Sequence, residues 1–399
     1  MEKVPTFATV DPYTGMNKTN PAILSNLVAG DWTSHNGDFL SFPDPMNGQT
    51  FIKSPDTQDL SEYIKGLESC PKSGLHNPIK NPDRYVYLGA VCAKAAALLA
   101  DPIIRDYFTK LTQRVMPKSW NQCLGEVDVT RIFLENLGGD GVRFLARGFS
   151  NPGNHIGQES KGYRWPYGPV VIIAPFNFPL EIPALQLMGA LAMGNRPLIK
   201  PERKVGVVIE QFIRLLIHAG LNPNDVDMLH CRGTVIGNMI KENSNKIRLI
   251  QFTGSSGVAE HLSQIMKGAV RIEDAGFDWK VIGPDYNEND LDFVAWQCDE
   301  DAYNASGQKC SAQSMLLCHD NWINNLLPKL ELLANRRKID DLTIGPILSW
   351  TNDQMKKHFD TVLKVPGAEL LFGGETLIEH SIPECYGAMK PTAIRVPID

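Results

Sequence analysis

The chain has 399 residues, a formal net charge of −6 and 43% hydrophobic residues. This length is enough for two or three domains that bury a core without disulfides. The eight cysteines are scattered, with no Cys-x-x-Cys pair and no histidine at zinc-finger spacing. We therefore expect a reducing compartment, mostly structural thiols and no metal site. Lysine and arginine are spread along the chain without a basic stripe, so we expect a small-molecule partner and no nucleic acid.

The most apolar stretch runs from Val170 to Met193 and is interrupted by three prolines, an asparagine and a glutamate. Such a stretch is a poor bilayer span, so we expect a soluble protein with no membrane partner. Residues 1–9 carry a single basic residue, which fits neither a secretory signal nor an arginine-rich transit peptide. Any targeting sequence is therefore expected to have been removed or never to have been present.

Residues before about Gly148 are predicted to form a lead-in followed by helices. Asn81-Pro82 is typical of a helix start, and Tyr85–Leu99 repeats apolar residues at helical spacing. A further long helix is predicted over Arg131–Ala146. Its three glycines, between positions 138 and 141, are interpreted as close helix packing, because no strand precedes them as a phosphate loop would require.

From Gly168 onward, short apolar runs alternate with amphipathic helices, as is typical of strands buried on both faces. This pattern predicts a doubly wound parallel sheet with ligand at the carboxyl ends of its strands. We expect residues 1–280 to hold a helical segment and this domain, and residues 281–399 to hold a second α/β unit with strands near Val281 and at 314–318. The predicted strands are Val170–Ala174, Arg196–Lys200, Val226–His230 and Ile247–Phe252, and the predicted helices are Leu180–Ala192, Val205–His218, Val235–Glu242 and Ser255–Met266.

Two turns are candidates for phosphate binding, because neither G-x-G-x-x-G nor a P-loop is present. Residues 252–255, Phe-Thr-Gly-Ser, leave a buried strand and enter a helix, where free N–H groups and the helix dipole favour an anion. Taken alone, this turn is more typical of an ordinary helix start with a serine cap. Residues 231–237 form a second such turn, in which Gly233 and Gly237 would let the backbone approach a dinucleotide.

Cys310 is the candidate nucleophile. Most cysteines fill cores, but Cys310 follows the polar sequence Asn-Ala-Ser-Gly-Gln-Lys, and Lys309 with the local N–H groups would stabilise a thiolate. Cys318 lies in an apolar run and is interpreted as buried, and the surroundings of Cys298 give no clear signal.

Glu273 and Asn177 can each be interpreted either as a structural or surface residue or as a catalytic residue. Glu273 follows the strand-like residues 270–272, so it would end a strand where catalytic loops gather, although most glutamates are surface acids. Asn177 stands among prolines and phenylalanines in Pro-Phe-Asn-Phe-Pro. Its amide would either stabilise a turn or donate to an oxyanion, and composition does not separate these alternatives.

In order along the chain, these segments resemble the aldehyde dehydrogenase superfamily. Asn177 matches the family's Pro-aromatic-Asn-Phe-Pro motif, Ser255 its Phe-Thr-Gly-Ser turn, Glu273 its glutamate motif and Cys310 its Gly-Gln-x-Cys motif. The stretches 162–169 and 273–280 are similar to the plant-type branch that acts on 1-pyrroline-5-carboxylate, or glutamate semialdehyde. The resemblance implies an aldehyde dehydrogenase-like α/β fold.

The resemblance implies that Cys310 attacks the semialdehyde carbon, that Asn177 and the Cys310 N–H stabilise the oxyanion, and that Glu273 activates water to hydrolyse the thioester. The activity implied is oxidation of L-glutamate 5-semialdehyde to L-glutamate in proline catabolism, in the mitochondrial matrix by resemblance, with the cytoplasm left open. The cofactor implied is NAD, with NADP open because Arg203 replaces the usual acid of the ribose site. The cofactor-binding residues implied are Ile173, Phe176, Lys200, Gly233, Gly237, Thr253, Gly254 and Ser255.

The resemblance also implies that the chain ends at Asp399, before the family's Glu-x-Phe-x-Pro motif and the rest of its catalytic domain. We therefore expect the second domain to be incomplete, and the chain to be less stable and less active than a full family member. The family's homo-oligomer is doubtful for this chain. Two alternatives stay open: a weakly active or inactive dinucleotide-binding form, and an acylating semialdehyde or acyl-phosphate reductase, which would not need Glu273 as a base.

Overall fold

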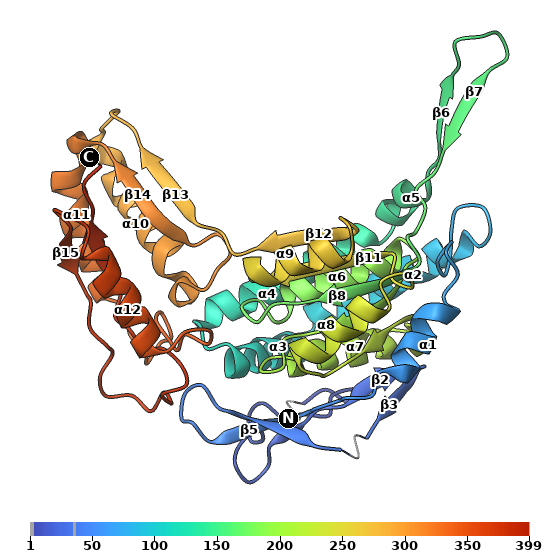
Figure 1. Cartoon of the computed structure of the whole chain (residues 1–399), viewed down its shortest axis with the longest axis horizontal. Coiled ribbons are helices and arrows are strands. Elements are labelled where there is room, and N and C mark those ends of the chain that lie inside the picture. Colours follow the sequence, from blue (N-terminus) through green and yellow to red (C-terminus); the bar gives the residue numbers. More distant parts are fainter. Residues whose placement is uncertain (1–3, 35–36, 399) are drawn as a thin grey trace. The chain divides into compact units, whose positions relative to one another are not determined.

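A computed structural model describes residues 4–34 and 37–398 of the chain (Figure 1). The first three residues, considered above as part of a targeting signal, lie outside this description. The chain divides into two compact units. Unit 1 comprises Met1–Phe42, Thr50–Thr112 and Leu124–Asp274, and unit 2 comprises Pro43–Gln49, Gln113–Cys123 and Ala275–Asp399.

In the described part of the chain, five strands come first and five helices follow, and strands and helices then alternate from β8 to β12 (Figure 1). The helices are α1 Ser61–Ser69, α2 Asp83–Ala100, α3 Pro102–Val115, α4 Trp120–Leu137, α5 Asp140–Ala146, α6 Glu181–Ala192, α7 Val207–His218, α8 Gly233–Glu242, α9 Ser256–Ile265, α10 Leu291–Tyr303, α11 Asp320–Asn335 and α12 Asn352–Val362. The strands are β1 Ala22–Ile23, β2 Asn26–Val28, β3 Asp31–Thr33, β4 Phe39–Pro43, β5 Thr50–Pro55, β6 Phe149–Pro152, β7 Glu159–Gly162, β8 Pro169–Ile173, β9 Arg196–Lys200, β10 Asp227–Met228, β11 Leu249–Gly254, β12 Val270–Asp274, β13 Asp278–Ile282, β14 Gln313–Cys318, β15 Glu369–Phe372 and β16 Ala393–Arg395. Short 3-10 helices span Pro223–Asp225, Glu288–Asp290 and Asn304–Gly307.

The main sheet of unit 1 has seven strands in the order β12-β11-β8-β9-β10-β2-β3. The strands from β8 to β12 run parallel, whereas β2 and β3 are antiparallel to their neighbours. From β8 the chain first proceeds to β9 and β10 on one side and then returns to β11 and β12 on the other. The strand order therefore reverses between β8 and β11. In doubly wound sheets, ligands bind at the carboxyl ends of the strands at such a switch point.

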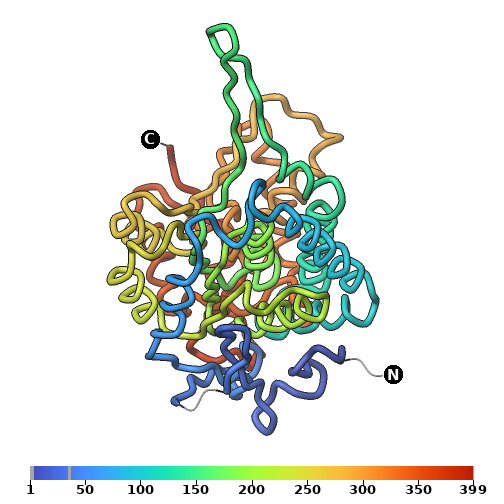
Figure 2. The backbone as a smooth tube through the Cα atoms, turned by 90° about the vertical axis from the view of Figure 1, so that its right-hand side faces the viewer, coloured from blue at the N-terminus to red at the C-terminus, as the bar shows by residue number. Residues whose placement is uncertain are grey.

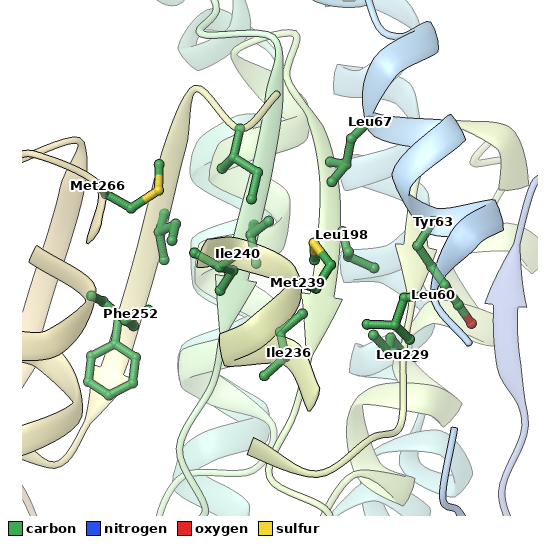
Figure 3. Packing of buried hydrophobic residues seen from close by; sticks show 14 of the residues in the cluster. Leu60, Tyr63, Leu67, Leu198, Leu229, Ile236, Met239, Ile240, Phe252 and Met266 are labelled. Atoms are coloured by element: carbon green, nitrogen blue, oxygen red, sulfur yellow. The ribbon is translucent and has the colours of Figure 1, made fainter. Parts of the chain in front are cut away.

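One face of this sheet carries a continuous apolar row. Val270, Ile250, Val171 and Leu198 are register neighbours across four parallel strands, and all four are buried. Helices α1, α8 and α9 cover this row with apolar side chains (Figure 3); those from α8 are Ile236, Met239 and Ile240. Helices α2, α6 and α7 contact one another, and α6 also contacts β8 and β9. Because both faces of the parallel strands are apolar, the sequence itself favours helices on both faces of the sheet.

The sequence prediction of the central elements is confirmed. The strand at Arg196–Lys200 has the predicted bounds, and the strands and helices predicted between residues 170 and 266 are present with ends shifted by a few residues. The strand predicted at Val226–His230 is shorter, since β10 covers only Asp227–Met228. Beyond β10 the Leu229 N–H still donates to the Ile199 carbonyl oxygen of β9 (2.9 Å), and the next N–H, that of His230, donates to the side-chain Oδ1 of Asn26 (2.8 Å).

The prediction of one long helix over Arg131–Ala146 is wrong. Helix α4 ends at Leu137 and α5 begins at Asp140, with Gly138 and Gly139 between them. Gly139 has φ +51° and ψ −117°, a conformation that glycine adopts at little cost and that residues with a side chain rarely adopt. The lead-in also contains strands that were not predicted, because its described residues form β1 to β5, of which β2 and β3 extend the main sheet.

Hairpin β6–β7 is antiparallel and projects from the body of unit 1 (Figure 2). Among the residues that the structure describes, no single helix is long and apolar enough to cross a membrane. Helices α2 and α3 meet that length and composition only when taken together, and they are bent by 83° at their junction.

Unit 2 contains the parallel pair β13–β14, with α10 and α11 on one face. Leu291 and Ala295 of α10 and Trp322 and Leu326 of α11 form its small core, against which alternate residues of the two strands pack. The opposite face of the pair carries exposed apolar side chains: Trp279, Val281, Met315 and Leu317. Strands β15 and β16 form a separate antiparallel pair.

Candidate active site

The carboxyl edge of the unit 1 sheet gathers several predicted site residues. Ile173, at the end of β8, is the register partner of Lys200 on one side and of Phe252 on the other. One position further along, Thr253 of β11 is the register partner of Glu273 of β12. The side chains predicted for the cofactor and the predicted base thus lie on adjacent strands at the switch point between β8 and β11.

Lys200 is a buried ammonium group at this edge, with 8% of the residue exposed. Burial lowers its pKa, and the nearby Glu202 carboxylate offsets only part of that effect. Within the described chain, the ammonium group makes no hydrogen bond or ion pair, and the Glu202 carboxylate accepts instead from the Lys204 N–H (2.6 Å). A buried cation without an acceptor is costly, so this position suits a ligand that brings oxygen atoms, such as the hydroxyls of a ribose.

Arg203 does not pair with a carboxylate in the part of the chain that the structure describes. Its guanidinium group lies over the ring of Phe42, 5.7 Å from the ring centre. The positive charge of Arg203 contributes to lowering the pKa of Lys200. A second cation therefore stands close to the lysine, at the position where the resemblance implies an acid.

Helices α8 and α9 begin at this edge, and neither has a side-chain capping hydrogen bond at its N-cap residue. Ser255 is the N-cap residue of α9, but its side chain makes no capping hydrogen bond. Arg232, the N-cap residue of α8, also lacks a capping bond and pairs instead with Asp56 at 2.8 Å. A Cβ atom placed at Gly233 or Gly237 of α8 would meet nothing within 4 Å. Since the fold does not itself fill this space, the start of α8 fits the close approach of a phosphate group.

Thr253 is held by a residue that the sequence analysis missed. Gln186 of α6 donates from Nε2 to the Thr253 Oγ1 at 2.8 Å, and both residues are buried. Because Thr253 accepts this bond, its own hydroxyl proton can be donated elsewhere. The signal was present in the sequence, since Gln186 is a single amide within the otherwise apolar turns of α6.

Asn177 lies in the loop between β8 and α6, where it is buried and where Phe176 is half-buried. Its Oδ1 accepts a hydrogen bond from the Phe178 N–H at 3.1 Å, which is the turn-stabilising role considered above. With the oxygen oriented in this way, an interaction with an oxyanion would come from the Nδ2 group. The loop ends where the carboxylate of Glu126 accepts from the first backbone N–H groups of α6.

Glu273 is the fourth residue of β12 and is exposed. In the described part of the chain its carboxylate makes no hydrogen bond or ion pair. The predicted strand end is confirmed, because β12 finishes at Asp274. The carboxylate is therefore available to accept a proton from water.

Cys310 belongs to unit 2 and is half-buried in the turn that leads into β14. The turn is preceded by three consecutive residues in the left-handed region, with φ of +52° at Ala305, +56° at Ser306 and +74° at Gly307. For each residue other than glycine this conformation costs about 1–2 kcal/mol. A Cβ atom at Gly276 would lie 2.9 Å from the Cys310 carbonyl oxygen, so glycine allows the chain after β12 to pass close to the turn.

Burial affects the two other thiols that the sequence analysis considered. Burial raises the pKa of Cys298 to about 11, and it also raises the pKa of Cys318. Cys318 was expected to be buried, but it is only half-buried, because it lies on a two-stranded sheet. Cys385 is exposed. In the described ranges, no group of three or more His, Cys, Asp or Glu side chains is arranged to hold a metal ion.

Comparison with known proteins adds to this geometry. Residues 89–396 match the model of the aldehyde dehydrogenase family. The chain is 53% identical to the mitochondrial delta-1-pyrroline-5-carboxylate dehydrogenase 12A1 of Arabidopsis thaliana, over 98% of the chain and 70% of that protein. It is 24% identical to the alpha-ketoglutaric semialdehyde dehydrogenase of Bacillus subtilis, over 88% of the chain and 72% of that protein.

Solved structures with a similar fold share fewer residues. The succinate-semialdehyde dehydrogenase of Burkholderia pseudomallei has a TM-score of 0.80 at 20% identity, over 93% of this chain and 75% of that one. The betaine aldehyde dehydrogenase of Staphylococcus aureus in complex with NAD+ has a TM-score of 0.79 at 19% identity, over 93% and 74% of the two chains. At such identities, these likenesses establish the fold.

Proposed function

The chain belongs to the aldehyde dehydrogenase family, and we propose on this basis that it oxidises L-glutamate 5-semialdehyde, the open form of 1-pyrroline-5-carboxylate, to L-glutamate. The observation that carries the proposal is the 53% identity, over 98% of the chain, to an enzyme named for this substrate. Relatives named for other semialdehydes share only about half as much, as in the 24% identity to the alpha-ketoglutaric semialdehyde enzyme. The overall reaction converts aldehyde, water and oxidised cofactor into carboxylic acid, reduced cofactor and a proton.

The nucleophile in this proposal is Cys310. Its thiolate attacks the aldehyde carbon, a C–S bond forms, and the carbonyl oxygen becomes an oxyanion. The half-buried position of Cys310 in a polar turn supports this role. The fully buried Cys298 is a poorer candidate, because burial raises its pKa to about 11 and so keeps its thiol protonated at neutral pH. The N–H of Cys310 and the Nδ2 group of Asn177 are the proposed donors to the oxyanion.

The base in this proposal is Glu273. Once hydride has left the substrate carbon, the acyl group remains on Cys310 as a thioester. Glu273 takes a proton from water as the water oxygen attacks the acyl carbon, the C–S bond breaks, and the acid and the Cys310 thiolate are released. The exposed carboxylate of Glu273, which has no partner in the described chain, supports this role.

The cofactor proposed is NAD, which would accept the hydride when bound. Lys200 would bind the hydroxyls of the adenosine ribose, and the starts of α8 and α9 would receive the phosphates at Gly233, Gly237 and Ser255. Ile173, Phe176, Thr253 and Gly254 would line the path at the same edge. The buried ammonium group of Lys200, which has no hydrogen-bond partner in the described chain, and the open space at the two glycines support this assignment. NADP stays an alternative because of Arg203.

The experiment is a spectrophotometric assay of cofactor reduction by the purified chain with 1-pyrroline-5-carboxylate. Succinate semialdehyde, alpha-ketoglutaric semialdehyde and betaine aldehyde serve as comparison substrates. We expect the highest kcat/KM with 1-pyrroline-5-carboxylate. A higher value with another aldehyde would disprove the substrate, and no reduction with any aldehyde would favour the inactive dinucleotide-binding alternative.

The cellular location proposed is the mitochondrion, because the Arabidopsis relative is mitochondrial. Immunodetection of the native protein in fractionated cells tests this proposal. Recovery with the soluble cytoplasmic fraction, separate from a mitochondrial marker, would contradict it.

A further inference from the structure

We propose that the segment Gly345–Leu348, here called the strap, positions the nucleophile, and that Ser306 and Gln308 fasten the Cys310 turn to it. The inference rests on the nucleophilic role of Cys310 in the proposed function. The strap, the turn and all their contacts lie within unit 2. Neither Ser306 nor Gln308 touches the reacting atoms in this proposal, so both act as positioning residues.

Ser306 makes a reciprocal pair of hydrogen bonds with the strap. Its Oγ donates to the Gly345 carbonyl oxygen at 3.1 Å, and the Gly345 N–H donates back to the same Oγ at 2.8 Å. The hydroxyl therefore satisfies both backbone groups of one strap residue. Such a pair fixes the position and the orientation of Ser306, which is one of the residues with a left-handed backbone.

Gln308 uses both ends of its amide. Its Nε2 donates to the Pro346 carbonyl oxygen at 3.0 Å and to the Ala305 carbonyl oxygen at 3.1 Å, and the Leu348 N–H donates to its Oε1 at 2.7 Å. The amide thereby joins two strap residues to the start of the turn. Gln308 stands two residues before Cys310, so any rotation of its backbone is passed to the nucleophile.

The strap itself is held firmly. Ile347 exchanges two backbone hydrogen bonds with Gly387, at 2.8 and 2.9 Å. A Cβ atom at Gly345 would lie 2.8 Å from the Pro117 carbonyl oxygen, so the strap backbone approaches a second segment closely. Gly345, Pro346 and Leu348 are buried. The strap can therefore act as a fixed support for the turn.

The left-handed backbone explains why a support is needed. Ala305 and Ser306 are held in a conformation that residues with a side chain rarely adopt, and strained conformations persist only when their surroundings impose them. Without the strap bonds, the turn would relax toward ordinary backbone angles and the thiol of Cys310 would move. A small misplacement of a reacting group can lower a rate about a hundredfold.

The test uses Ser306→Ala and Gln308→Met, alone and combined. Ser349→Ala, an exposed serine directly after the strap, is the matched control. We expect the double variant to lower kcat about tenfold to a hundredfold, while the KM for NAD changes less than about twofold. We also expect alkylation of Cys310 by iodoacetamide to slow and its pH profile to move to higher pH, because the local N–H groups proposed to stabilise the thiolate would be displaced. The control should match the wild type in all three measurements.

Rescue separates positioning from a loss of stability. Glycine accepts left-handed angles without strain, so adding Ala305→Gly to Gln308→Met should recover part of the lost kcat and alkylation rate. Unchanged alkylation in folded Ser306→Ala and Gln308→Met chains would overturn the proposal, as would failure of Ala305→Gly to restore any of it. Alkylation needs no aldehyde. If the wild type turns over no aldehyde, the proposed function fails, but the alkylation profiles still decide whether the strap positions Cys310.

Discussion

The carboxyl edge of the unit 1 sheet and the Cys310 turn of unit 2 hold their chemical groups in different ways. At the sheet edge, Ile173, Thr253 and Glu273 occupy positions fixed by a ladder of backbone hydrogen bonds between parallel strands. In the turn, side chains hold a left-handed backbone against a neighbouring segment. A side-chain substitution at the sheet edge should therefore remove one function and leave the neighbouring groups in place. A substitution in the turn should change the geometry of the nucleophile itself.

The largest expected effect is that of Cys310→Ala, which removes the nucleophile from unit 2. We expect aldehyde oxidation to fall by at least about ten thousandfold. Affinity for NAD, measured by calorimetric titration, should stay within about twofold of the wild type, because the proposed cofactor groups belong to unit 1. Cys318→Ala, a half-buried thiol eight residues away in sequence, is the control and should remain active. Retained turnover in Cys310→Ala would show that Cys310 is not the nucleophile.

The next effect concerns the sheet edge. Glu273→Gln should lower steady-state kcat about a hundredfold to a thousandfold, because the amide cannot accept the proton of the attacking water. The backbone ladder of β12 is unchanged, so the acyl group should still form on Cys310 and accumulate as a thioester, which intact-protein mass spectrometry detects.

The neighbouring exposed carboxylate provides the control for this prediction. Asp274→Asn removes a charge at the end of the same strand and should leave turnover within about threefold of the wild type. If Glu273→Gln changed turnover as little as Asp274→Asn, the hydrolytic assignment would be lost and an acylating enzyme would explain the chain better.

The same contrast explains what the sequence could predict. Parallel strands buried on both faces appear as short apolar runs, so β8, β9 and β11 and the position of Glu273 at a strand end were predictable. The Gly138-Gly139 break was missed because apolar spacing continues across it, although two consecutive glycines are themselves a helix-end signal. Cys318 lies on the covered face of its sheet but stays half-buried because that sheet is a two-stranded pair, and local hydropathy does not contain that information.

The fastening of the Cys310 turn could not be predicted from local sequence. Ser306 and Gln308 bond to backbone groups 38 to 40 residues further along the chain. Every residue except proline offers the same backbone groups, so the strap residues carry no mark of their role. Gln186 is an intermediate case, because a single amide in an apolar helix indicates a buried polar contact but not its partner, Thr253.

Lys200→Met tests the buried cation of unit 1. We expect the Kd for NAD to rise about tenfold to a hundredfold, since hydrogen bonds of a charged group contribute about 1.5–3 kcal/mol. Without cofactor, the same variant should be more stable than the wild type, because an unpaired buried charge is removed. Chemical denaturation with and without NAD measures both effects, and equal NAD affinity in the two chains would contradict the ribose assignment.

This variant also has a predicted pH dependence. Burial lowers the pKa of Lys200 in the folded chain below its ordinary value of 10.5, which applies to the unfolded chain. Between these two pKa values only the unfolded chain binds the proton, so this group makes the free energy of unfolding of the wild type rise with pH through that window. The stability gain of Lys200→Met should therefore be largest below the window and should shrink as pH approaches 10.5.

The smallest expected effect concerns Arg203, next to the same ribose position. Arg203→Glu restores an acid near Lys200 and should increase the preference for NAD over NADP about fivefold, because a carboxylate repels the 2′-phosphate that an arginine tolerates. The effect should be modest, since the guanidinium group is half-buried over Phe42 and partly screened by solvent. Arg203→Gln, which removes the positive charge without adding a negative one, should fall between the two. Equilibrium titration of both dinucleotides measures the ratio. An unchanged ratio in Arg203→Glu would mean that Arg203 stays on the Phe42 ring and does not take part in choosing the cofactor.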